Sequence, residues 1–229
     1  MKKTISILFI IFLLVGCGST SSTGQLHQDL DSENNKTTLK EQEQQQQQEV
    51  QEPKEFETIT FNGSGDDVVE FDLQENAFYL IHVKGNAEGR HFALKAYDET
   101  GYYDLLINTS KVYDGKVFDG DFNKNTLEVN AQGEWTIEVL DLTNASTHIE
   151  QGQTVTGHGD DVLLVYSYGK TATFKQNGKG HVAVKIYDGR GYYDLAVNES
   201  GEYEGKFMLG KNPCIITVES ESDWELTLN

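Results

Sequence analysis

The sequence has few of the residues that cross-link or interrupt a chain, with two cysteines and two prolines among 229 residues. Two cysteines cannot build the disulfide framework of a small secreted scaffold. Basic residues are also scarce, since 18 lysines and arginines stand against 37 aspartates and glutamates, for a formal net charge of -19. An acidic surface of this kind repels nucleic acid and bare anionic lipid. We therefore expect a fold that depends on its hydrophobic core, and no nucleic-acid partner.

The common catalytic motifs are absent from the sequence. It holds no G-x-S-x-G elbow, no H-E-x-x-H pair, no C-x-x-C and no glycine-rich phosphate loop before a helix, and its six histidines are scattered. We expect neither enzymatic activity nor a cofactor. The remaining enzymatic alternative is a hydrolase, or a hydrolase accessory protein, that uses aspartate and histidine in a cleft between domains.

The first seventeen residues have the layout of an export signal. Lys2 and Lys3 precede the apolar run Ile5–Val15, which is too short to span a bilayer. The end of this segment, Leu14-Val15-Gly16-Cys17, closely resembles the lipobox of bacterial lipoproteins. That resemblance implies cleavage before Cys17 and lipid attached to its thiol and its new amino group. The alternative is an ordinary secretory signal with an incidental cysteine.

The lipobox resemblance implies a mature protein anchored in the lipid bilayer, on the extracytoplasmic face of the cell membrane. Removal of signal residues 1–16, which contain two lysines and no acid, would change the formal charge to about -21. With Cys17 lipidated, Cys214 has no cysteine left for an internal disulfide. Residues 17–55 are rich in Ser, Thr, Gln, Glu and Asn, which favours a disordered tether. A partner-binding helix over Leu39–Val50 is the alternative, although it lacks an apolar stripe.

An internal repeat dominates the rest of the chain and predicts two copies of one domain, at 56–142 and 148–229, joined by a short linker over 142–147. The motifs recur in the same order, at spacings that slide from 94 to 89 residues. The matching segments are Gly63–Val68 with Gly157–Val162, Tyr97–Leu105 with Tyr187–Leu195, Tyr113–Lys116 with Tyr203–Lys206, and Trp135 with Trp224.

Each copy is predicted to be an all-β, jelly-roll-like antiparallel sandwich, because apolar residues alternate over short runs between Gly, Asn and Asp turns. In the order of its motifs, each repeat is similar to bacterial prepeptidase C-terminal domains and related β-sandwich modules of secreted proteins. Alternation along the last strand of each copy predicts that Trp135 and Trp224 belong to the core. The strands expected in the first copy are 58–61, 68–73, 78–83, 91–97, 102–108, 113–118, 126–130 and 135–140.

The two middle strands of each copy predict an outward stripe of polar and aromatic residues. A four-residue loop over Asp98–Gly101 would place facing residues in pairs whose numbers sum to 199, and the same rule applies to the second copy. Phe92, Leu94, Tyr103 and Leu105 would then point to the buried face. The predicted pairs are Tyr97 with Tyr102, Lys95 with Asp104, His91 with Asn108, Tyr187 with Tyr192, Lys185 with Asp194, and His181 with Asn198.

This stripe has two interpretations. Its pairs set strand register and cover the sheet, or they form a shallow aromatic and polar face for a glycan or a protein. The second interpretation, together with the lipobox, favours non-catalytic binding of an envelope or surface partner. A structural spacer without a specific ligand is the competing interpretation.

Aspartates follow both Gly-x-Gly turns and have two explanations as well. Turn chemistry accounts for Asp66, Asp67, Asp160 and Asp161, since aspartate binds nearby backbone amides. Calcium is the alternative, with Asp98 or Asp188 as a further ligand, although no spacing in the chain matches a known calcium loop. These four aspartates are therefore weak calcium candidates.

Overall fold

A computed structural model describes residues 56–74, 77–85, 89–166, 169–188, 192–210 and 215–229. The expected signal, the lipidation site Cys17, the tether and Cys214 lie outside the described residues. The described residues form one compact unit. Within the described part of the chain, no helix has the length and apolarity needed to cross a membrane.

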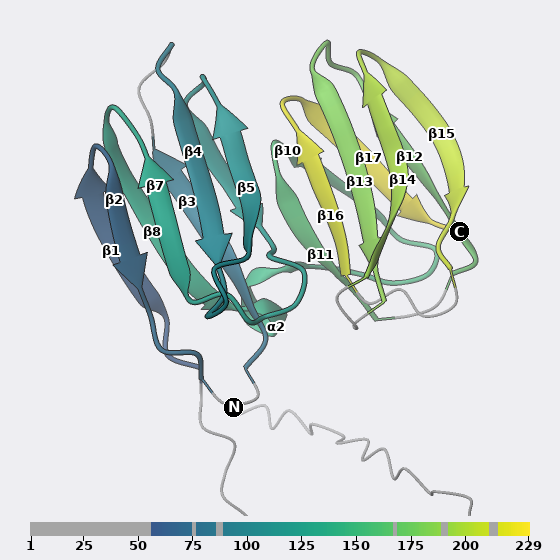
Figure 1. The fold of residues 1–229 in the computed structure, drawn as a ribbon. Coiled ribbons are helices and arrows are strands. Elements are labelled where there is room, and N and C mark those ends of the chain that lie inside the picture. Colours follow the sequence, from purple (N-terminus) through teal and green to yellow (C-terminus); the bar gives the residue numbers. More distant parts are fainter. Residues whose placement is uncertain (1–55, 75–76, 86–88, 167–168, 189–191, 211–214) are drawn as a thin grey trace, which may run out of the picture. The chain divides into compact units, whose positions relative to one another are not determined.

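The first copy folds into eight antiparallel strands in two sheets (Figure 1). The sheet orders are β1-β8-β3-β6 and β2-β7-β4-β5, which is the strand order of a jelly roll. Each of the eight predicted strands is present, with ends that move by up to three residues. The strands are β1 (Ile59–Ser64), β2 (Asp67–Glu70), β3 (Tyr79–Gly85), β4 (Phe92–Tyr97), β5 (Tyr103–Thr109), β6 (Tyr113–Val117), β7 (Thr126–Asn130) and β8 (Glu134–Asp141).

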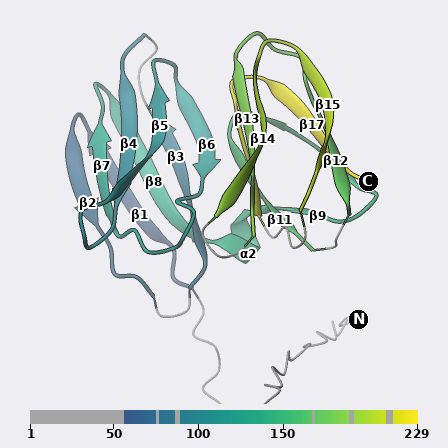
Figure 2. The same cartoon turned by 45° about the vertical axis from the view of Figure 1, so that its right-hand side comes forward.

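The second copy repeats this architecture and adds one strand. Its sheets are β10-β17-β12-β15 and β14-β13-β16-β11-β9, in which β9 pairs in parallel with β11 at the sheet edge (Figure 2). The prediction of two tandem all-β sandwiches is confirmed. The strands are β9 (Thr147–Ile149), β10 (Thr154–His158), β11 (Asp161–Val165), β12 (Thr171–Gln176), β13 (His181–Tyr187), β14 (Tyr193–Ser200), β15 (Tyr203–Met208), β16 (Ile215–Ser220) and β17 (Asp223–Leu228).

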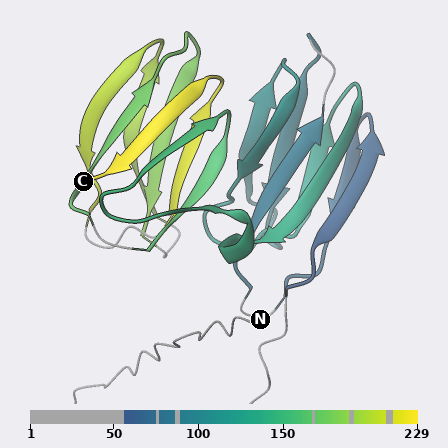
Figure 3. The same cartoon turned by 180° about the vertical axis from the view of Figure 1, so that it is seen from behind.

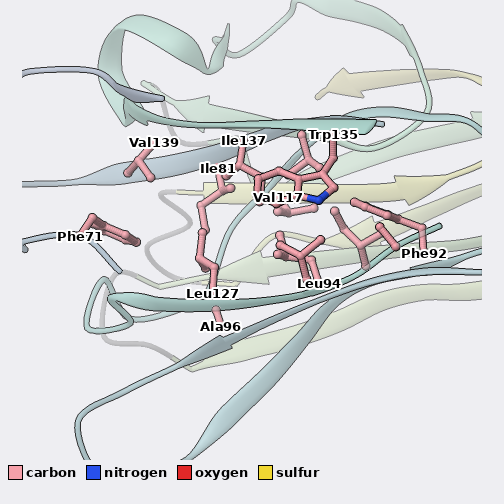
Figure 4. Close-up of a cluster of buried hydrophobic side chains, with 14 of the residues drawn as sticks. Phe71, Ile81, Phe92, Leu94, Ala96, Val117, Leu127, Trp135, Ile137 and Val139 are labelled. Carbon is pink, nitrogen blue, oxygen red and sulfur yellow. The ribbon is translucent and has the colours of Figure 1, made fainter. Parts of the chain in front are cut away.

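Each sandwich has its own hydrophobic core, with a tryptophan at one end. In the first, the side chains of Trp135, Ile137 and Val139 project from β8 between the sheets (Figure 4). Trp135 is 3% exposed, and Trp224 in the second core is equally buried. Both tryptophans are therefore core residues, as the alternation on their strands predicted.

The repeated Gly-x-Gly turn shapes the space around each tryptophan. A Cβ on Gly63 would lie 2.1 Å from Cζ2 of Trp135, so only glycine leaves room for the ring. Gly65 adopts a φ of +80°, and its carbonyl oxygen accepts a hydrogen bond of 2.9 Å from Nε1 of Trp135. Gly157 approaches Trp224 in the same way, at 2.2 Å. The motif that revealed the repeat thus fixes one end of each core.

The segment between the sandwiches is folded and contributes to a third apolar cluster. It consists of the short helix α2 (Leu142–Ala145), capped by the side chain of Asp141, and then β9 (Figure 3). Leu142 is 4% exposed. This third cluster joins residues of the two copies, so the sandwiches share buried surface in addition to their own cores. Its buried members are Leu80, Phe118, Leu142, Val162, Tyr187 and Ile215.

Candidate functional site

The register of the middle hairpins differs from the prediction. Tyr97 lies opposite Tyr103 instead of Tyr102, and Lys95 lies opposite Leu105 instead of Asp104. The second copy has the same register. Tyr187 lies opposite Tyr193 instead of Tyr192, and Lys185 lies opposite Leu195 instead of Asp194. Asn198 lies opposite Ala183 instead of His181. Asn108 correspondingly lies opposite Ala93 instead of His91. All six predicted opposite pairs are therefore wrong.

Turn geometry explains the first shift in register. The backbone N–H of Asp98 donates to the carbonyl of Tyr102 at 3.0 Å, and Gly101 adopts a φ of +83°, so the loop holds three residues instead of four. The Asp98 carboxylate accepts hydrogen bonds from the hydroxyl and N–H of Thr100, which lower its pKa. A bulge opposite Leu94 and Lys95 then shifts the register once more.

The corrected register changes which side chains face outward. Phe92 and Leu94 are buried as predicted, but Tyr103 is 48% exposed and Leu105 is 51% exposed. The predicted burial of these two residues is wrong, because the three-residue loop puts them on the same face as Lys95. The predicted stripe is thus a wider and more apolar surface than the sequence suggested.

An acid, a lysine and two tyrosines form the outward cluster of the first sandwich. Nζ of Lys95 lies 2.8 Å from Oε1 of Glu128, and the hydroxyl of Tyr97 donates to Oε2 at 2.6 Å. The hydrogen bond to Glu128 raises the pKa of Lys95, and its ammonium also lies 5.5 Å from the ring centre of Tyr103. Lys95 therefore pairs with Glu128 on β7 and not with the predicted Asp104.

The second sandwich repeats this cluster with a displaced acid. Lys185 forms an ion pair with Glu219 on β16, and its Nζ lies 5.3 Å from the ring centre of Tyr193. Tyr187 and Tyr193 lie 5.4 Å apart between ring centroids. Lys185 faces Thr217 across the strands.

The predicted histidine–asparagine contacts are present in both copies although the residues are not opposite one another. Nε2 of His91 lies 3.1 Å from Oδ1 of Asn108. The corresponding distance between His181 and Asn198 is 2.8 Å. These contacts run diagonally across the strand pair because the bulge moves the asparagines along β5 and β14.

A groove runs between the two sandwiches, and we call it the inter-sandwich groove. One part, of about 380 Å³, has Tyr102, Asp104 and Leu105 of the first sandwich on one side and Tyr187 and Tyr193 of the second on the other. A neighbouring part, of about 510 Å³, shares Leu105, Leu106 and Glu219 with the first. The volumes fall in the range of ligand sites. The aromatic face of the second sandwich is therefore the floor of a concave surface.

Only some of the predicted stripe lines this groove. From the first copy, Tyr102, Asp104 and Asn108 do so, and from the second, His181, Lys185 and Tyr187. The other six, His91, Lys95, Tyr97, Tyr192, Asp194 and Asn198, are not among its lining residues. The same motif thus has a different setting in each copy.

A buried lysine supports the groove from behind. Lys124 is fully buried, and its Nζ lies 3.0 Å from a carboxylate oxygen of Asp104 and 3.0 Å from one of Asp121. Burial acts to lower the pKa of Lys124, but the hydrogen bonds to these two carboxylates outweigh it and raise the pKa. The ammonium also lies 5.7 Å from the ring centre of Tyr102, so it holds both groove residues in place.

A partly buried aspartate at the other end of the groove joins the sandwiches. Oδ2 of Asp160 accepts a hydrogen bond of 2.7 Å from the hydroxyl of Tyr113, on the first sandwich, and Oδ1 accepts one of 2.8 Å from the N–H of Ser220. The backbone N–H of Lys116 donates to the carbonyl of Asp160, and the Lys116 ammonium lies 3.2 Å from Asp161. This set of contacts is the polar counterpart of the third apolar cluster.

The four weak calcium candidates all have protein partners. Asp66 accepts a hydrogen bond from the N–H of Ala131 at 2.9 Å, and Asp67 from the N–H of Val68 at 2.8 Å. Asp161 accepts from the hydroxyl of Thr147, and Asp160 is engaged as described above. Within the described residues, no three His, Cys, Asp or Glu side chains are grouped so as to hold a metal ion. Turn and interface contacts account for these carboxylates.

Sequence reasoning missed the groove, Lys124 and the joint at Asp160. Divergence between the repeats was the available signal. The segment Asp119–Lys124 of the first copy has no acidic counterpart in the second, where Leu209 and Lys211 occupy the positions of Asp119 and Asp121. A charged cluster that is present in one copy alone marks a place where the copies differ in role.

Burial makes the joint sensitive to pH. The pKa of Asp160 is raised from 3.8 to about 6, and burial is the largest cause. The hydrogen bonds from Tyr113 and Ser220 act in the opposite direction, because they favour the charged form. Nearby Glu219 raises the pKa further, and Lys185 lowers it. Between about pH 4 and pH 6 the folded state keeps a proton that the unfolded state has lost. The contribution of Asp160 to stability therefore falls as the pH rises through this window and stays low above it.

We predict that Asp160→Asn gains stability relative to the wild type by about 2–3 kcal/mol when the pH rises from 4 to 7.5, because the amide does not ionise. Urea unfolding of both proteins at the two pH values measures this difference. Asp66→Asn, at the exposed equivalent position, is the matched control for the same substitution in the same turn. An Asp160→Asn effect that is equal at both pH values would contradict the assignment of a buried, titrating joint.

Comparison with protein families finds no match, and comparison with curated proteins finds none either. Among solved structures, the chain is similar to cAMP-bound PfPKA-R, at 8% identity and a TM-score of 0.22 over 74% of this chain and 70% of that one. It is also similar to the regulatory subunit of a cAMP-independent protein kinase A from Trypanosoma brucei, at 12% identity and a TM-score of 0.23 over 74% and 73%. Likeness at this level carries no argument about fold or function, which must come from the groove itself.

Proposed function

We propose that this protein is a surface lipoprotein, held on the extracytoplasmic face of the membrane by lipid at Cys17, whose tandem sandwiches bind a surface partner without catalysis. The partner is an envelope or surface glycan or protein. The observation that carries the proposal is the concave, tyrosine-lined groove between the sandwiches. Tyrosine rings offer apolar area and a polar tip, which suits both sugar rings and peptide side chains.

The non-catalytic part of the proposal is supported by the surroundings of the groove histidines. Nε2 of His181 contacts the amide oxygen of Asn198, so that contact supplies no carboxylate for proton transfer. His158 does pair with Asp223, at 2.7 Å, but their side chains are 73% and 83% exposed. Water has free access to this pair, unlike the enclosed acid–base pairs of hydrolases.

A spacer protein is the second candidate, and the first sandwich favours it. Its outward cluster of Lys95, Tyr97 and Tyr103 is covered by the Lys95–Glu128 ion pair and the Tyr97 hydrogen bond, and none of these three residues lines the groove. A sheet face of this kind projects without binding. The two functions therefore make opposite predictions for equivalent tyrosines in the two copies.

The anchor is tested by Cys17→Ser. If lipid on this thiol holds the protein, the variant should move from the membrane fraction to the soluble extracytoplasmic fraction, because it loses the proposed lipid attachment. Fractionation followed by immunoblotting measures the change, with Cys214→Ser as the matched control that remains on the membrane. Retention of Cys17→Ser on the membrane would contradict the proposed anchor.

Binding in the groove is tested by Tyr193→Ser, with Tyr103→Ser as its equivalent outside the groove. Both tyrosines are about half exposed, at 54% and 48%, so neither substitution disturbs a core. Glycan arrays and pull-downs with the full chain would first provide a ligand. Tyr193→Ser should then weaken its binding at least tenfold, while Tyr103→Ser changes it less than twofold. Equal losses of binding in the two variants would contradict the groove as the binding site. If neither the arrays nor the pull-downs yield a ligand, the spacer function is favoured.

A further inference from the structure

The outer edge of β5 faces the inter-sandwich groove. β5 ends its sheet, and within the described residues its only strand partner is β4. Six consecutive residues, Asp104–Thr109, line the two parts of the groove. Side chains alternate between the two faces of a strand, so a run of consecutive lining residues means that the backbone edge itself borders the groove.

The neighbouring edge strand, β6, is closed by the second sandwich, whereas β5 is open. The N–H of Lys116 on β6 donates to the carbonyl of Asp160, and β6 contacts β11. Natural proteins protect free edges with lysine or proline, but β5 reads Tyr-Asp-Leu-Leu-Ile-Asn-Thr and has neither. Its protective features are its bulge and the charged side chain of Asp104. In Figure 2, β5 and β6 lie on the side of the first sandwich that faces the second.

We infer that the β5 edge receives an extended, basic peptide segment of another exported protein, which adds to the sheet as a fifth strand within the groove. This inference rests on the proposed binding function and specifies its ligand. Backbone hydrogen bonds to the free edge of β5 would supply affinity, and the walls of the groove would select side chains at alternate positions. A run of six residues corresponds to about 20 Å of extended chain.

Charge identifies the segment as basic. Seven carboxylates line the groove, against two lysines, Lys111 and Lys185. Adding Lys124 behind the wall still leaves a surplus of acid. Glu219 and Glu221 already form ion pairs with Lys185 and Lys111, and the carboxylates that remain in surplus favour lysine and arginine in the segment, because like charges across such a surface cost affinity. Exposed Tyr193 offers a ring on which such a cation can stack, as Lys185 already does at 5.3 Å.

The same charge argues against a second copy of this chain as the occupant. The chain carries a net charge of -19, and β14, the edge strand of the second sandwich that corresponds to β5, contains Asp194 and Glu199. Pairing β14 of one molecule with β5 of another would bring these acids to an acidic groove. A basic partner removes this repulsion and gains from the surplus charge.

The test is selection of binders to the full chain from a displayed library of random ten-residue peptides, followed by fluorescence polarisation with the selected peptides. We expect peptides with basic residues at alternate positions. Methylation of alternate backbone nitrogens should weaken them at least tenfold, because it removes donors to β5. Leu105→Lys, which puts a cation on the edge, should weaken binding at least tenfold, and Leu195→Lys, at the equivalent exposed position of β14, less than twofold.

Each other outcome overturns the inference in a recognisable way. Selected peptides that tolerate methylation or Leu105→Lys do not pair with β5. If a glycan binds in a way that depends on Tyr193 and no peptide is selected, the proposed function is supported and the peptide ligand is contradicted. If neither the glycan screen nor the peptide screen yields a binder, both the proposed binding function and the peptide inference are contradicted. A dimer in analytical ultracentrifugation that Leu105→Lys dissociates would identify a second copy as the occupant.

Discussion

The hydrogen bond between Tyr113 and Asp160 is the contact on which the rest of the arrangement depends. It links the edge of the first sandwich to a turn of the second and is partly buried at the polar end of their shared surface. Partial burial of a carboxylate is costly unless it is hydrogen-bonded, and both oxygens of Asp160 have a partner only when Tyr113 and Ser220 are in place. The joint is thereby specified in geometry as well as in energy. The groove exists because this joint and the third apolar cluster hold its two walls.

Duplication provided two copies of one fold, and small differences gave them different roles. Asp66 and Asp160 both bind a backbone N–H across their turn, at Ala131 and Ser220. In the second copy the other carboxylate oxygen also accepts the hydrogen bond from Tyr113. The same residue type therefore stabilises a turn in the first repeat, and both a turn and the interface in the second.

The outward lysine–tyrosine clusters follow the same principle. Around Lys95 the cluster lies outside the groove and is closed by an opposite acid on β7, and around Lys185 it lies on the floor of the groove. In the second copy, Thr217 takes the position opposite the lysine, and the acid Glu219 lies two residues along the strand. The free edge of β5 then borders that floor. The asymmetry of the site thus comes from placement of the repeats and from a few substitutions between them.

Most of the fold was predictable from the sequence, and most of the site was not. Alternation gave all eight strands of the first copy and the buried positions of Trp135 and Trp224, because these depend on local period and burial alone. Register failed at Asp98–Gly101, since a single residue of loop length and a bulge at Leu106 decide which faces meet. The groove depends on contacts between residues about fifty positions apart, such as Tyr113 with Asp160, which no local pattern encodes.

The most direct test of this account is the relative orientation of the sandwiches in solution. Residual dipolar couplings of backbone amides in the full chain give an alignment tensor for β1–β8 and another for β10–β17. If the Tyr113–Asp160 joint and the third cluster fix the groove, both sets of couplings fit one common tensor with the orientation of the structure. Two tensors that differ in magnitude would mean that the sandwiches move independently, and a permanent groove would be contradicted.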